Sequence, residues 1–183
     1  MSEVVLVNER DEEIGTMEKM AAHRYAHLHR AFSVFIFNSR GEMLLQQRSR
    51  EKYHSGGLWT NACCSHPLPG EDILEAAGRR LMEEMGFKTR LKKIFHFTYK
   101  SEFDNGLTEY EFDHVFTGVY EGMIRPDRSE LQNYRYLDLE SINAGLEDDP
   151  GAYTAWFHIA FPLVAKWAGQ QWGNIIDLPM ADT

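Results

Sequence analysis

The 183-residue chain has little cysteine and no long apolar run. Its two cysteines, Cys63 and Cys64, are adjacent, and neighbouring cysteines rarely bridge each other, so we expect a reduced, cytoplasmic protein. No apolar stretch approaches the roughly 20 residues that cross a bilayer. The first residues also lack the basic start and apolar core of a signal peptide. We therefore expect neither a membrane protein nor a disulfide-stapled secreted domain.

Positive charge is also scarce, because 19 lysines and arginines face 28 aspartates and glutamates, for a formal net charge of −9. Such a surface repels nucleic acid and anionic membranes on average, so we expect neither as a partner. An anionic small-molecule ligand would need cations gathered in one place. The length suits one domain over residues 1–183, as a monomer or a small homo-oligomer.

The pattern of apolar residues predicts a mixture of strands and helices. Strands are expected at residues 4–7, 31–37, 43–47, 94–100, 108–119 and 134–137. The turn at residues 38–41 makes the second and third of these a hairpin. One helix is expected to end at Gly86, and another to cover residues 153–168 with a kink or restart at Pro162. This order indicates an α/β (α+β) domain with a mixed or mostly antiparallel sheet layered between helices.

Histidines and glutamates occur at spacings that suit a metal site. His23 and His29 lie just before a predicted strand, and His66 follows Cys64 by two residues in WTNACCSHP. Glu109 and Glu111 flank one residue of another strand, so both carboxylates point to one face. Three imidazoles and two carboxylates suit a divalent transition metal, and magnesium less well. The same residues would also be unremarkable as surface histidines and a solvated acidic face, and spacing alone does not decide between the two.

A second feature is the segment SHPLPGEDILEAAGRRLMEEMGF, residues 65–87, which resembles the Nudix box. Six positions of that box are matched, by Glu71, Arg79, Leu81, Glu83, Glu84 and Gly86. Such a loop–helix–loop presents carboxylates that hold divalent ions against a diphosphate. Two positions depart from it: Ser65 replaces the opening glycine, and Arg80 replaces a glutamate. Arg80 removes a metal-binding carboxylate and adds a cation for phosphate oxygens.

Taken together, the segments resemble type I isopentenyl-diphosphate isomerases, a family with a Nudix-like core. The resemblance runs from about residue 17 to 157 and is carried by MEKMAAHRYAHLHRAFSVFIFN, LLQQRSREKYHSGGLWTNACCSHP, the altered box, TEYEFDHVF and YTAWF. It implies a single Nudix-like domain whose mixed β-sheet is layered between helices. It also implies that the chain isomerises isopentenyl diphosphate to dimethylallyl diphosphate in isoprenoid biosynthesis.

The resemblance also implies roles for individual residues. It assigns one divalent ion, Mn²⁺, Zn²⁺ or Mg²⁺, to five side chains: His23, His29, His66, Glu109 and Glu111. Glu84 would help to bind a Mg²⁺ that arrives with the diphosphate. The diphosphate itself would meet four cations: Lys19, Arg48, Lys52 and Arg80. Cys64 and Glu111 would form the acid/base pair, Tyr99 would hydrogen-bond to the carboxylate, and Trp156 would stabilise a carbocation.

Two other functions remain open. A Nudix-type pyrophosphatase acting on a nucleoside diphosphate derivative would share the box and the metal, although Arg80 and Cys64 do not suit simple hydrolysis. A non-catalytic Nudix-like domain that binds a ligand or partner is the third possibility, and the complete acid, base and metal set argues against it.

Overall fold

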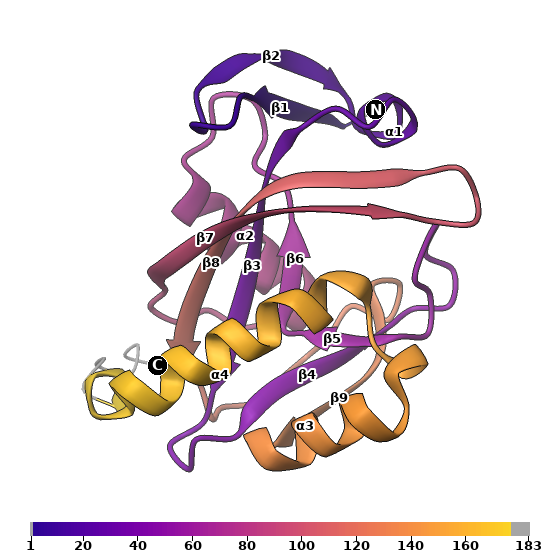
Figure 1. The fold of residues 1–183 in the computed structure, drawn as a ribbon. Coiled ribbons are helices and arrows are strands. Elements are labelled where there is room, and N and C mark those ends of the chain that lie inside the picture. The colour runs from indigo at the N-terminus through magenta and orange to yellow at the C-terminus, as the bar shows by residue number, and fades with distance from the viewer. Residues whose placement is uncertain (1, 177–183) are drawn as a thin grey trace.

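A computed structural model describes residues 2–176, which form a mixed β-sheet with helices on both faces (Figure 1). The strands are β1 (Glu3–Val7), β2 (Glu13–Glu18), β3 (His29–Phe37), β4 (Met43–Arg48), β5 (Trp59–Asn61), β6 (Cys63–Ser65), β7 (Lys92–Glu102), β8 (Thr108–Val119) and β9 (Leu131–Leu137). The helices are α1 (Lys19–Arg24), α2 (Ile73–Met85), α3 (Leu139–Asp148), the short 3₁₀ turn η1 (Pro150–Ala152) and α4 (Ala155–Ile176). The predicted layered α+β class is confirmed.

Strand β3 is the hub of the sheet. It pairs in parallel with β8 along its whole length and antiparallel with β6, while β4 pairs with β5 and β9. The predicted hairpin between β3 and β4 is correct only at its base, because the two strands share the single pair Phe37↔Met43 and then diverge. Apolar side chains on both faces of each strand explain this result, since each strand finds other partners inside the core.

The helical layers rest on two separate apolar cores, one on each face of the sheet. Phe32, Val34 and Ile36 of β3 pack with α2, whereas Phe35 and Phe37 pack with α3 and α4. Alternate residues of a strand point to opposite faces, so β3 supplies both cores at once. Figure 1 shows α2 behind the sheet and α4 crossing in front of it.

Helix α2 carries the box segment and has a defined start and end. The Asp72 side chain accepts hydrogen bonds from the first free amides of the helix. Gly86 ends the helix, as predicted, in the left-handed conformation with φ of 75°. A β-carbon at this position would lie 2.1 Å from the Arg125 carbonyl oxygen, so the close approach also requires glycine.

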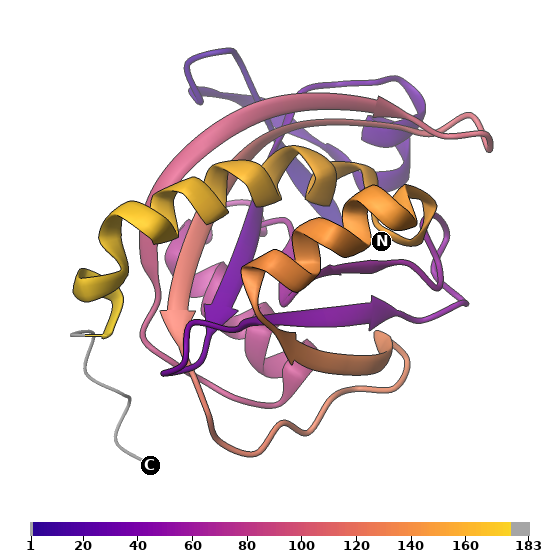
Figure 2. The ribbon, with the colours of Figure 1, turned by 60° about the horizontal axis from the view of Figure 1, so that its bottom comes forward.

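Helix α4 begins two residues later than the sequence predicts, at Ala155, and continues through Pro162 as one element. Tyr153 instead bridges to Trp59 of β5. Helices α3 and α4 lie over the same face of the sheet. Figure 2 shows them with the bottom of the Figure 1 view turned toward the reader. No helix among residues 2–176 combines the length and apolar character needed to span a bilayer.

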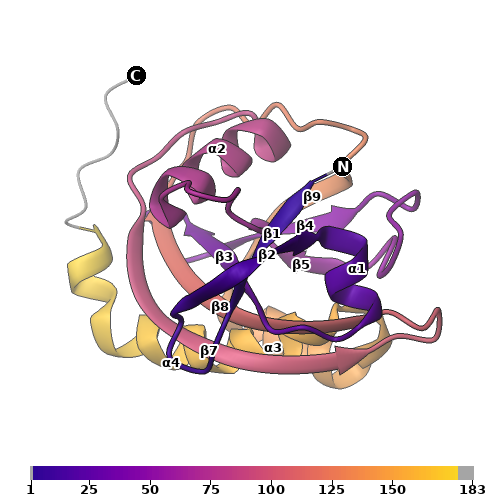
Figure 3. The ribbon, with the colours of Figure 1, turned by 90° about the horizontal axis from the view of Figure 1, so that it is seen from above.

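A long hairpin of β7 and β8 curves around the molecule, as the view from above in Figure 3 shows. Its tip reaches the loop of residues 49–58, where the Asn105 side chain donates to the Tyr53 carbonyl at 3.0 Å. Strand β1, which the sequence predicted at residues 4–7, lies beyond the start of β3 together with β2 and α1, which it did not predict (Figure 1). The loop of residues 49–58, the β7–β8 hairpin and α1 each line part of the pocket described next.

Candidate active site

One pocket collects most of the predicted site residues. It is lined by Lys19, Ser33, Gln46, Arg48, Lys52, Tyr53, His54, Cys64, Ser65, His66, Arg80, Glu84, Tyr99, Glu109, Glu111, Glu130 and Trp156. Two further predicted residues, His23 and His29, are fully buried and do not line the pocket themselves. Their rings contact the ring of His66, which does. The structure therefore brings all thirteen predicted side chains into one neighbourhood.

Strand register explains why these residues meet. The parallel pair of β3 and β8 sets His29 opposite Glu111, and the antiparallel pair of β7 and β8 sets Tyr99 opposite the same residue. Strand β6 then places Cys64 opposite Ser33 of β3. Residues two apart on a strand share a face, so Glu109 points to the same side as Glu111.

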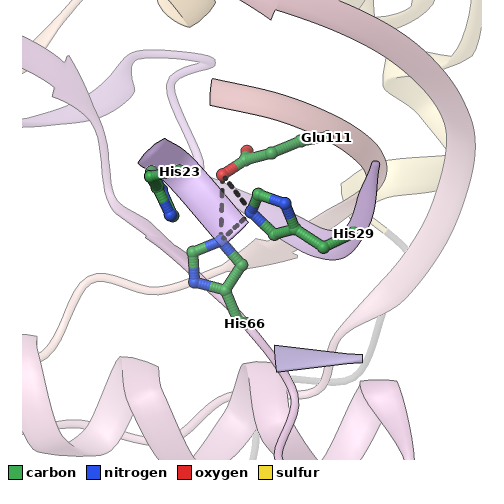
Figure 4. A group of neighbouring side chains, drawn as sticks. All are labelled: His23, His29, His66 and Glu111. Carbon is green, nitrogen blue, oxygen red and sulfur yellow. Dashed lines mark hydrogen bonds and ion pairs between the residues drawn. The ribbon is translucent and has the colours of Figure 1, made fainter. Parts of the chain in front are cut away.

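Three histidines and Glu111 converge at the centre of the site (Figure 4). Nε2 of His66 lies 2.9 Å from Oε1 of Glu111 and 3.2 Å from Nε2 of His29. The Nε2 atom of His23 is buried and has no hydrogen-bond partner. Ligand atoms that share an ion at about 2.1 Å lie roughly 3 Å apart when neighbouring bonds are perpendicular. The spacing and the orphaned nitrogen therefore fit a divalent cation.

Backbone carbonyls hold two of these rings in place. Nδ1 of His23 lies 2.7 Å from the Lys19 carbonyl, and Nδ1 of His29 lies 2.8 Å from the His27 carbonyl. A ring that donates through Nδ1 keeps the lone pair of Nε2 free for a metal. Burial lowers the pKa of His23 to about 4 and that of His66 to about 3, so both imidazoles are neutral, as ligands must be.

Glu109 lies slightly apart from that group. Its carboxylate falls within 4.8 Å of ligand atoms of His23 and of His54, a histidine to which the sequence analysis gave no role. His54 lies in the polar loop of residues 49–58, outside any strand or helix that could have signalled its direction. Because His23 belongs to both groups, the two groups adjoin.

Tyr99 connects the two glutamates. Its hydroxyl lies 2.8 Å from Oε2 of Glu111 and 3.0 Å from Oε2 of Glu109. Burial and the neighbouring Glu111 charge raise the pKa of Glu109 to about 8. Burial also works to raise the pKa of Glu111, but the neighbouring His29 and His66 imidazoles outweigh it and hold that pKa well below its usual range. Of the two carboxylates that Tyr99 joins, Glu109 is therefore the one that more readily takes up a proton.

Cys64 is a thiol rather than a thiolate. Its Sγ lies 3.1 Å from Oδ1 of Asn61 and 3.4 Å from Oγ of Ser33, which donates to Asp113 at 2.6 Å. Burial raises the pKa of the thiol well above its usual value, and the nearby Asp113 adds to the effect. Its neighbour Cys63 is fully buried in the core that α2 covers.

The four predicted cations line the pocket together with carboxylates. Lys52 pairs with Glu130, and the Arg80 guanidinium lies 2.8 Å from Glu84 and 3.4 Å from Glu130. The Arg48 guanidinium lies over the Trp156 ring, 5.2 Å from its centroid, and the Lys19 ammonium lies 5.0 Å from the Tyr53 ring. These cations offset the acidic balance of the chain locally.

The carboxylates of the box separate into two roles. Glu71 forms a two-bond ion pair with Arg79, whereas Glu83 reaches Arg79 and Arg80 on the helix surface. Only Glu84 enters the pocket, and burial raises its pKa. Of the acidic side chains on α2, it alone lies where it could contact a pocket-bound ion.

Comparison with known proteins identifies the family of the chain. Residues 27–157 match the NUDIX domain family. The chain is 50% identical over 167 residues to the isopentenyl-diphosphate Delta-isomerase of Pectobacterium atrosepticum, covering 91% of this chain and 93% of that one. It is 44% identical over 170 residues to the enzyme of the same name from Burkholderia multivorans, covering 90% and 97%.

Solved structures support the same fold. DR0079 from Deinococcus radiodurans superposes with a TM-score of 0.68 over 80% of this chain and 90% of that one, at 22% identity. The MutT protein of Methanosarcina mazei gives a TM-score of 0.63 over 76% and 94%, also at 22% identity. Given these matches, the chain belongs to the isopentenyl-diphosphate Delta-isomerase family, and its domain is a NUDIX domain.

Proposed function

We propose that Cys64 and Glu111 are the acid/base pair with which this chain isomerises isopentenyl diphosphate to dimethylallyl diphosphate. The observation that carries the proposal is that Cys64 of β6 and Glu111 of β8 line the same pocket. Burial raises the pKa of the Cys64 thiol, which favours it as proton donor, whereas the neighbouring His29 and His66 lower the pKa of Glu111, which favours it as proton acceptor. Moving a double bond by one carbon requires one proton donor and one proton acceptor.

Cys64 is proposed to give the first proton. The terminal methylene carbon of the substrate takes the thiol proton, which leaves a tertiary carbocation at the next carbon. The ionised Glu111 then removes a proton from the carbon on the other side, and the bond pair forms the new alkene. Asn61 and Ser33 hold the Cys64 sulfur through the contacts described above.

Trp156 is proposed to stabilise the cation. Its ring is 3% exposed and lines the pocket, and the Arg48 guanidinium already lies near its face. An indole face stabilises a desolvated cation by about 2 kcal/mol or more. A pocket closed by aromatic residues also keeps water from trapping the carbocation.

The diphosphate is proposed to bind Lys19, Arg48, Lys52 and Arg80, with Glu84 as a ligand of an accompanying Mg²⁺. Binding would exchange the present carboxylate partners of Lys52 and Arg80 for phosphate oxygens. Arginine suits this exchange because its planar fork binds phosphate through two hydrogen bonds.

A divalent ion at His23, His29, His66, Glu109 and Glu111 would polarise Glu111 and fix its direction when bound. Mn²⁺, Zn²⁺ and Mg²⁺ are the proposed candidates for this site. The residues themselves supply the rest: Tyr99 ties the two carboxylates together, and backbone carbonyls orient the rings.

The decisive test uses proton NMR of isopentenyl diphosphate in heavy water. Glu111→Gln should form no product but should exchange deuterium into the terminal methylene, because Cys64 still protonates it reversibly. Cys64→Ala should do neither. Exchange by Cys64→Ala and none by Glu111→Gln would reverse the two roles.

A Nudix-type pyrophosphatase is the rival function. Arg80 stands where hydrolases of that group carry a glutamate, and Glu71 is engaged with Arg79. Incubation with Mg²⁺ and a nucleotide sugar should therefore release no phosphate, while isopentenyl diphosphate is isomerised. Because the acid must stay a thiol, we also propose a reducing, cytoplasmic setting, and a monomer or small homo-oligomer as the working form.

A further inference from the structure

His54 lies at the edge of the proposed metal site and has no role in the scheme above. It is 7% exposed and belongs to the loop of residues 49–58 between β4 and β5. A polar side chain this buried needs a partner, because an unsatisfied buried group costs free energy.

Neighbouring rings fix the orientation of His54. Its imidazole stacks on Phe103 with centroids 4.6 Å apart and planes at 12°, and meets the edge of Tyr53 at 4.4 Å. Phe103 comes from the tip of the β7–β8 hairpin, so two distant segments clamp the ring. Nδ1 lies 3.2 Å from Oγ of Ser55 on the same loop. In this orientation, Nε2 of His54 points toward the Glu109 carboxylate.

Nε2 of His54 resembles Nε2 of His23. Both atoms are buried and lack a hydrogen-bond partner of acceptable geometry. Nε2 of His54 lies 3.1 Å from Oε1 of Glu109, and the ligand atoms of His23, His54 and Glu109 all lie within 4.8 Å of one another. His23 also belongs to the group formed with His29, His66 and Glu111. Two sets of potential ligands thus share one orphaned nitrogen.

We propose that His54 is a sixth protein ligand of the divalent ion held by the three other histidines, Glu109 and Glu111. The inference rests on the metal site in the proposed function and extends its ligand set to four imidazoles and two carboxylates. Such a set favours a transition metal over Mg²⁺. Six protein ligands also leave a six-coordinate ion no position for water or substrate, so its effect passes through Glu111.

The test measures metal binding rather than turnover. Metal-free wild type, His54→Ala and His54→Asn are titrated with Mn²⁺ against a chelator, and with Co²⁺ while the visible absorption is recorded. His96→Ala is the matched control, because His96 is exposed and stacks on Phe112 on the opposite face of β8. Circular dichroism checks that each variant is folded.

Loss of His54 should weaken Mn²⁺ binding at least about tenfold. It should also intensify the Co²⁺ bands, as expected when a six-coordinate ion becomes five-coordinate, while the control matches wild type. Unchanged affinity and spectrum in folded His54 variants would leave His54 as a hydrogen-bond donor to Glu109 and overturn the proposal. Two tightly bound ions per wild-type chain in the absence of diphosphate, one of them lost with His54, would also overturn it.

A measurement on wild type alone covers the case in which the variants do not fold. The Co²⁺-loaded protein should show four paramagnetically shifted, exchangeable imidazole N–H signals in proton NMR, and three would exclude His54. If wild type binds neither Mn²⁺ nor Co²⁺, the metal site of the proposed function fails as well, and the two failures are thereby distinguished.

Discussion

The pocket has two regions that differ in how their charges are satisfied. At the mouth, Lys52 and Arg80 already pair with Glu130 and Glu84. At the floor, imidazole nitrogens converge on Glu111 and Glu109, and Nε2 of His23 and Nε2 of His54 have no hydrogen-bond partner. In the proposed function, the cations of the mouth exchange their carboxylate partners for an anion, whereas the ligands of the floor receive a cation. The proposed function therefore assigns binding and chemistry to different residues, which mutation can separate.

The largest expected effect comes from removing the proton-carrying groups of the floor. Cys64→Ala and Glu111→Gln should each reduce turnover by about 10²–10⁴-fold or more, because each removes a general acid or base. Isomerase assays check the rates and circular dichroism the fold. Cys63→Ala is the control, because that side chain is fully buried in the core and does not line the pocket, and it should keep turnover within about twofold. Near wild-type rates in both active-site variants would refute the acid/base assignment.

Removing the divalent metal should cause the next largest fall in turnover. A chelator should lower the rate at least about 100-fold, because the ion contributes several kcal/mol to charge stabilisation. Dialysis followed by added Mn²⁺ or Zn²⁺ with Mg²⁺ should restore it. Full activity in a sample shown by elemental analysis to be metal-free would disprove the metal assignment for the floor.

A change at the mouth should affect substrate binding more than chemistry. Arg80→Glu restores the glutamate of the Nudix box and places a negative charge beside the diphosphate. We expect KM for isopentenyl diphosphate to rise roughly 10–100-fold, the value of one or two charge-assisted hydrogen bonds, with a smaller fall in kcat. Arg40→Glu is the control, since Arg40 is exposed and pairs with Glu42 away from the pocket. A fall in kcat with unchanged KM would show that the two regions are not separable.

The smallest effect concerns the thiol of Cys64. Burial raises the pKa of both cysteines, and a raised thiol pKa means that the proton stays on sulfur to higher pH. Thiolate absorbance at 240 nm should therefore stay flat between pH 6 and 9 in the native protein, and rise near pH 8.5 in urea, the ordinary thiol value. A native rise below pH 8 would contradict Cys64 as the resting acid.

Local sequence signals predicted part of this structure well. The box helix ends at Gly86 because only a residue free to adopt positive φ fits against Arg125, and that requirement is visible in the sequence. The pairing of β3 with β8 was not predictable, because both strands are apolar and nothing in them specifies a neighbour. The same limit explains the mistaken extent of the β3–β4 hairpin.

The site was predicted by resemblance more than by spacing. His23, His29 and His66 come from a helix, a strand and a segment after a strand, so their convergence depends on tertiary structure. His54 carried no periodic signal, since it lies in an irregular loop and is buried only because the β7–β8 hairpin tip covers it. Long-range packing of this kind cannot be read from neighbouring residues.

The register between β3 and β8 decides which side chains of β8 face the pocket. A slip of one residue would turn Tyr110 and Phe112 toward the pocket and Glu111 toward the opposite face, although the strands would remain equally apolar. A misregistered chain would thus lose the carboxylates on which the floor depends. A divalent ion at the proposed site would therefore stabilise, by mass action, only those chains whose two strands are correctly aligned.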